Sequence, residues 1–210
     1  MSNDVAYPVF RGPDPVLALG VARRLVEFGR REDSRVSCYA ELHSVDEVRR
    51  GARELPEGWF RGQETAEEVE ELVPFEDLPA WLVGVRGPGL PADPAAYEGR
   101  LPVDYELLAQ PVGGVEDAFT AAIGPSVGEI NWTELSWPAA PGAGFPGEST
   151  HAEVTLLLNA GTRAYEPADD HTVLVHVRSA VIDGREREEP YAHWLAERAG
   201  LTVIGPGQRV

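Results

Sequence analysis

HAEVTLLLN at residues 151–159 and TVLVHVR at residues 172–178 are the stretches that decide the fold. Both are rich in β-branched and other apolar residues, and both contain the polar–apolar alternation that is typical of β-strands. Residues 161–170, between them, are rich in polar residues and are expected to form a loop. A β-sheet is therefore predicted in this part of the chain.

Helices and further strands are expected along the rest of the chain. Hydrophobic spacing, together with helix start and stop signals, predicts helices at residues 16–30, 44–55, 64–73, 114–123 and 190–199. Short apolar or β-branched runs predict strands at residues 36–42, 81–85, 103–109, 129–137 and 201–204. Helices and strands are interspersed without regular alternation, so the sequence predicts an α+β fold, with a mixed or mainly antiparallel sheet and about five helices packed on it.

Segments rich in proline and glycine are expected to be irregular. Residues 7–14 are predicted to form an irregular arm, and Trp59 and Phe60 are placed in a loop. Residues 138–147 are also predicted to be a loop, because their prolines and glycines cannot sustain a strand ladder. A chain of 210 residues is long enough to bury one sizeable core. We predict a single compact domain over residues 1–210, with a minor boundary, if there is one, at 138–147.

Composition limits the cellular environment and the cofactors. The single cysteine, Cys38, can form neither an intrachain disulfide nor a thiolate zinc site, and it is expected in the core. The N-terminus lacks a signal-peptide pattern and no apolar run is long enough to span a bilayer, so a cytoplasmic location is expected. No phosphate-binding glycine loop is present, and no cofactor is predicted. All eighteen basic residues are arginine, which indicates a GC-rich, bacterial origin.

Charge is distributed unevenly along the chain, whose net charge is −17. Residues 1–63 carry ten arginines and ten acidic residues, whereas residues 64–162 carry seventeen acidic residues and two arginines, a net charge of −15. A field of this sign repels phosphates and anionic lipids, so neither nucleic acid nor membrane is an expected partner. It favours association with a basic protein. The alternative is a charged surface that only keeps the protein soluble.

Seven residues of this acidic region are candidates for binding such a partner. They are Glu67, Glu68, Glu71, Glu129, Trp132, Glu134 and Trp137. Tryptophan rings beside carboxylates can anchor a basic partner, because the ring face attracts a guanidinium group through a cation–π contact. The alternatives are that the glutamates form a solvated helix face and that the tryptophans cover an edge of the core.

Alternation along the two quoted strands suggests a second kind of site. If the strands pair, one polar face of the sheet would carry His151, Glu153, His176 and Arg178. Two histidines and a carboxylate could hold a divalent metal or act as acid and base near neutral pH. The alternative is that this is the solvent-exposed face of an antiparallel sheet. The His151-Ala-Glu153 spacing does not indicate a zinc deaminase, because those enzymes need a downstream cysteine pair.

The leading hypothesis from the sequence is a non-enzymatic interaction module that binds a basic protein through residues 64–162. An inhibitor or a toxin-neutralising protein is one concrete form of it. The competing hypothesis is a metal-assisted or acid–base enzyme that uses His151, Glu153 and His176. A module that binds a small ligand in an aromatic pocket is a third hypothesis. The sequence leaves the oligomeric state open.

Overall fold

The computed structural model divides the chain into two compact units. The first, called here the terminal unit, contains residues 1–36 and 129–210, and the second, the central unit, contains residues 37–128. The loop at residues 138–147 lies inside the terminal unit. The prediction of a single domain stays a prediction. The structure describes residues 4–62, 84–162, 166–178, 181–182, 185–186 and 188–209.

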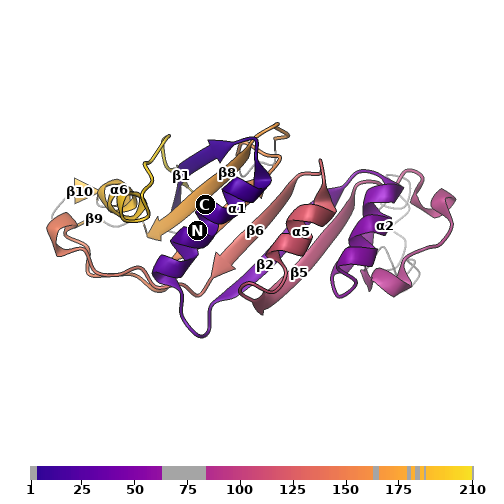
Figure 1. The fold of residues 1–210 in the computed structure, drawn as a ribbon, viewed down its shortest axis with the longest axis horizontal. Helices are drawn as coiled ribbons and strands as arrows, with labels where there is room; N and C mark the ends of the chain where they lie inside the picture. Colours follow the sequence, from indigo (N-terminus) through magenta and orange to yellow (C-terminus); the bar gives the residue numbers. More distant parts are fainter. Residues whose placement is uncertain are drawn as a thin grey trace. The chain divides into compact units, whose positions relative to one another are not determined.

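The terminal unit is built on antiparallel strands (Figure 1). In spatial order these strands are β11 (Gln208–Arg209), β1 (Asp4–Gly12), β8 (His171–Arg178), β7 (Glu153–Leu158) and β6 (Gly128–Thr133). β8 pairs with β1 on one side and with β7 on the other. The two stretches that decide the fold therefore form adjacent strands. A separate small hairpin consists of β9 (Val181–Ile182) and β10 (Arg185–Glu186).

Two helices, α1 (Pro15–Gly29) and α6 (Glu188–Arg198), pack against β8 and β1. Figure 1 shows α1 lying across β8. Oδ1 of Asp14 caps the start of α1, because it accepts hydrogen bonds from the backbone N–H groups of Val16 at 2.9 Å and Leu17 at 3.1 Å. The helix then buries one apolar stripe, which consists of Ala18, Leu19, Val21, Ala22, Leu25, Val26 and Gly29.

The prediction of an irregular arm at residues 7–14 is wrong, because most of this segment belongs to β1. Pro8 has no N–H to donate, but the strand accommodates it beside a register shift between Pro8 and Phe10. Val5 and Tyr7 are buried, so β1 contributes apolar surface to the core. Pairing with two neighbouring strands outweighs the local effect of the proline.

The central unit has its own strands and helices. In spatial order its strands are β2 (Arg35–Leu42), β5 (Val103–Pro111), β3 (Trp59–Gly62) and β4 (Val85–Arg86). β3 pairs antiparallel with β5 and with β4. Its two α-helices are α2 (Val45–Glu54) and α5 (Glu116–Ile123), which pack against each other.

Aromatic rings fill the core of the central unit. The Phe60 ring meets the Tyr105 ring edge-on at a centroid distance of 5.0 Å, and Tyr105 stacks on Phe119 of α5 at 5.9 Å. The loop predicted around Trp59 and Phe60 is therefore wrong, because this segment is the strand β3. Cys38 is buried, as predicted, and its burial raises the pKa of the thiol.

The α+β class is confirmed, and each strand pair of known register is antiparallel. The described residues contain four α-helices, each at a predicted position, against about five expected from the pattern. The fifth expected helix, at residues 64–73, lies outside the described residues. Residues 201–204 form no strand. In the part of the chain that the structure describes, no helix combines the length and the apolar character needed to cross a bilayer.

Alanine substitutions at two glycines of α1 test the packing of the terminal unit. A Cβ at Gly29 would lie 2.6 Å from Cζ3 of the buried Trp137, whereas a Cβ at Gly20 would have no atom within 4 Å. We expect Gly29→Ala to lower the free energy of unfolding by about 1–3 kcal/mol through overpacking. We expect Gly20→Ala to raise it by roughly 0.5–1 kcal/mol through helix propensity. Urea denaturation followed by circular dichroism measures both, and equal stability of the two variants would contradict this packing.

Candidate functional site

The four residues predicted to act in acid–base catalysis all lie in the terminal unit, on or next to the paired strands β7 and β8. Glu153 is the cross-strand partner of His176 in the antiparallel register of β7 and β8. Arg178 lies opposite Asp4 of β1. His151 precedes β7, and its Nδ1 pairs with Oδ1 of Asp4. Glu153 and His176 are therefore direct neighbours, whereas His151 is held by a carboxylate of another strand.

His176 belongs to a chain of hydrogen bonds inside the sheet. Its Nε2 lies 2.9 Å from Oγ1 of Thr155, which donates to Oδ1 of Asn131 at 3.2 Å. Asn131 in turn donates from Nδ2 to Oε2 of Glu153 at 3.4 Å. Thr155 thus links the His176 ring to Asn131 and, through Asn131, to Glu153. His176 and Thr155 are 1% and 0% exposed, so the predicted polar face of the sheet is buried at these two positions.

Metal binding has little support among the described residues. They contain no group of three or more His, Cys, Asp or Glu side chains that could hold a metal ion. His171, at the start of β8, is buried, and its Nδ1 accepts the backbone N–H of Asn159 at 3.0 Å. Desolvation lowers the pKa of His171, although the Pro13 backbone and the charges of Asp170 and Asp14 act in the opposite direction. Burial and the acceptor role of Nδ1 therefore both favour the neutral form of this imidazole.

The residues predicted to bind a partner differ in their exposure. Trp132 and Trp137 are 0% and 1% exposed, and Glu129 is 3% exposed, whereas Glu134 is exposed. The indole Nε1 of Trp137 donates to the backbone carbonyl of His176 at 2.7 Å. In this structure neither ring is presented on the surface, because both are part of the core. Outside the described residues lie Glu67, Glu68 and Glu71.

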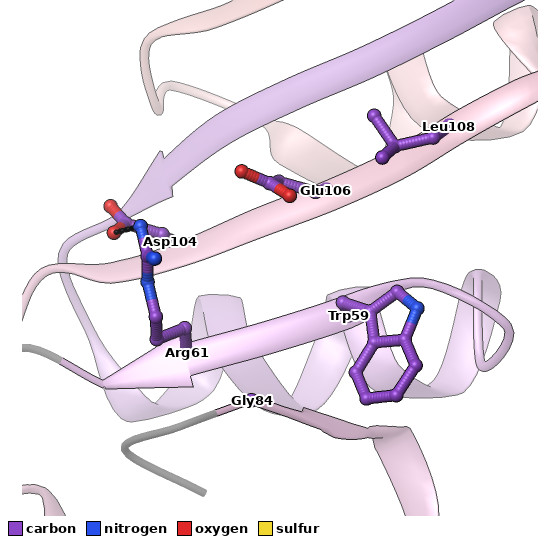
Figure 2. A pocket seen from close by; sticks show the side chains of 6 residues that line it. All are labelled: Trp59, Arg61, Gly84, Asp104, Glu106 and Leu108. Atoms are coloured by element: carbon purple, nitrogen blue, oxygen red, sulfur yellow. Dashed lines mark hydrogen bonds and ion pairs between the residues drawn. The ribbon is translucent and has the colours of Figure 1, made fainter. Parts of the chain in front are cut away.

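The outward face of β3 and β5 carries a hollow that sequence reasoning missed (Figure 2). In the antiparallel register Trp59 lies opposite Glu106, and Arg61 lies opposite Asp104. Side chains alternate between the two faces of a strand, so these four share one face, opposite to the core face. The hollow has a volume of about 280 Å³ and is lined by Trp59, Arg61, Gly84, Asp104, Glu106 and Leu108.

Large apolar side chains are exposed in this hollow. Trp59 and Leu108 are each 47% exposed and belong to the same lining, so the hollow presents apolar surface to solvent. The guanidinium carbon of Arg86 lies 5.3 Å from the centre of the Trp59 ring. Arg86 is also held by Glu57, whose Oε2 lies 2.7 Å from Nη1. One guanidinium group of the chain therefore already makes a cation–π contact with Trp59.

The two carboxylates of the hollow have different surroundings. Nη2 of Arg61 lies 3.2 Å from Oδ2 of Asp104 (Figure 2). Glu106 makes no hydrogen bond or ion pair with any residue that the structure describes. Figure 2 shows its side chain between Asp104 and Leu108, on the strand next to Trp59. The lining of the hollow therefore contains both an exposed indole ring and a carboxylate that has no partner among the described residues, and both groups attract a cation.

The sequence does carry a signal for this face. In residues 103–108 the buried Val103, Tyr105 and Leu107 alternate with the outward-facing residues. This period of two predicts a strand with one face in the core. The sequence predicts a loop at Trp59, and a loop has no cross-strand partner. The position of Trp59 opposite Glu106 therefore could not be predicted.

Comparisons with known proteins give no match: no family model, no curated protein and no solved structure matches this chain. The His176 network is buried, whereas the hollow on β3 and β5 presents its side chains at the surface. The hollow is the stronger candidate for contact with another molecule.

The state of His171 predicts how stability depends on pH. Its pKa is lowered in the folded protein, so between the lowered value and the unfolded value of about 6.5 the unfolded chain binds more protons. Its neutral form therefore supports the fold above that range, and this contribution is lost as the pH falls through it. In His171→Asn, Oδ1 of the new side chain can accept the same N–H, but the group does not titrate. When the pH is lowered from about 7 to 5, we expect the free energy of unfolding to fall less in this variant than in the native protein. Urea denaturation at both pH values measures this, and an identical loss in the two proteins would exclude the assigned role.

Proposed function

We propose that this protein is a non-enzymatic interaction module that binds a basic segment of a partner protein on the outward face of β3 and β5. The observation that carries the proposal is a hollow lined by both the exposed Trp59 and Glu106, whose carboxylate has no partner among the described residues. An exposed tryptophan in a hollow is the kind of side chain that dominates binding energy at protein interfaces. Inhibition or neutralisation of a basic protein is one form that this function would take.

Net charge supports a basic partner. The chain carries −17 overall, and residues 64–162, which contribute β5 and Leu108 to this face, carry seventeen acidic residues against two arginines. A negative field increases the rate of association with a basic protein and disfavours nucleic acids and anionic lipid surfaces. This long-range attraction favours partners of positive charge, while the hollow supplies the short-range contact.

The acid–base enzyme has less support. His176 is buried and hydrogen-bonded to Thr155, and His151 is paired with Asp4. A general base must reach the proton that it abstracts in a bound substrate. A side chain that is 1% exposed cannot do so without a rearrangement of the sheet.

Selection from a random peptide library displayed on phage tests this proposal. We expect the immobilised protein to enrich peptides of net positive charge, and Trp59→Ala to weaken their binding about tenfold or more. Raising the ionic strength should weaken the same complexes, because part of the attraction is screened. Affinities are measured by titration with synthetic copies of the enriched peptides.

Ile204→Ala is the matched control, since Ile204 is a comparably exposed apolar residue of the terminal unit, at 51%. It should leave the affinities unchanged. Enrichment of neutral or acidic peptides, or binding that survives Trp59→Ala at full strength, would refute the proposed function.

A further inference from the structure

We infer that the hollow on β3 and β5 binds one arginine side chain of the partner, with its guanidinium group between the Trp59 ring and the Glu106 carboxylate. This inference rests on the proposed function and specifies its central contact. It names arginine, and not basic residues in general, as the residue that the face selects.

The chain itself directs two arginines to this face. Arg86 lies over the Trp59 ring at 5.3 Å, and Arg61 bonds to Asp104 at 3.2 Å. Each of these contacts uses one of the two chemistries that a guanidinium group offers, stacking on an aromatic ring and hydrogen bonding to a carboxylate. The same face leaves one carboxylate, Glu106, without a partner among the described residues.

The strand register places Trp59 and Glu106 at opposite positions of β3 and β5. Both side chains line the hollow, so a group that occupies the hollow can reach both of them. A guanidinium group is planar and presents several N–H donors in a fixed arrangement, so it can stack on a ring while it donates to a carboxylate. A lysine ammonium is a compact, strongly hydrated charge and has no planar face to stack.

The walls of the hollow are partly apolar. Leu108 is 47% exposed and lies in the same lining as Glu106 and Trp59. The methylene groups of an arginine side chain cover apolar surface while the charged end stays near polar groups. With a volume of about 280 Å³, the hollow admits one long side chain. Arg61 is already paired with Asp104, so it does not neutralise Glu106.

The experiment compares two peptides of equal charge and length, in which glycine and serine separate either four arginines or four lysines. Their dissociation constants are measured by calorimetric or fluorescence titration at low and at physiological ionic strength. We expect the arginine peptide to bind about fivefold more tightly, since a cation–π contact and a paired hydrogen bond both favour it.

Three variants assign this preference to the hollow. Glu106→Gln and Trp59→Ala should each bring the ratio of the two dissociation constants closer to one, because each removes one of the two contacts that favour arginine. Trp59→Phe, which keeps an aromatic face, should retain part of the preference. Glu197→Gln is the charge-matched control, because Glu197 is an exposed residue of α6 in the terminal unit, and it should leave the ratio unchanged. Circular dichroism and thermal melting check that each variant is folded.

The outcomes separate this inference from the proposed function. Equal affinities for the two peptides, both weakened by Glu106→Gln and Trp59→Ala, would overturn the arginine inference and leave the basic-partner function in place. Binding that neither substitution changes would overturn both. An arginine preference of unchanged size in both Glu106→Gln and Trp59→Ala would place the selective contact elsewhere and would also overturn the inference.

Discussion

The antiparallel register of β3 against β5 is the constraint on which the surface of the central unit depends. It places Phe60 and Tyr105 on the same face, where their rings meet and the Tyr105 ring also stacks on Phe119. Because strand side chains alternate, the burial of Phe60 forces Trp59 to the opposite face. A slip of one residue would exchange the faces and bury an arginine, Arg61, in an aromatic core. The cost of that exchange fixes the register, and the hollow follows from it.

The distribution of arginines explains why, among the described residues, one acidic group of this face has no partner. Arg61 bonds to Asp104, and Arg86 bonds to Glu57 while it lies over Trp59. These pairs are exposed to solvent and contribute little to stability. Their effect is to neutralise individual carboxylates of an acidic chain, so that Glu106 differs from its neighbours. The net charge makes the electrostatic potential of the surface negative. The local ion pairs decide which carboxylate remains able to bind a cation.

Regular elements were predictable where the sequence has a clear period. Apolar spacing found α1, and alternation found β7 and β8, because both patterns arise within one element. β1 and β3 were missed for a shared reason: their local signals, such as Pro8 and the short run at Trp59, are weaker than the pairing that makes them strands. The exposure of tryptophans was equally hidden, since Trp132 is buried and Trp59 exposed through contacts between distant segments.

The cross-strand pairing of Trp59 with Glu106 can be measured directly. Backbone nuclear Overhauser effects in the isotope-labelled protein report which residues of β3 and β5 face each other. This account predicts cross-peaks that connect Trp59 with Glu106 and Arg61 with Asp104. A set of cross-peaks that places Trp59 opposite Tyr105 or Leu107 would turn the indole toward the core and contradict the account.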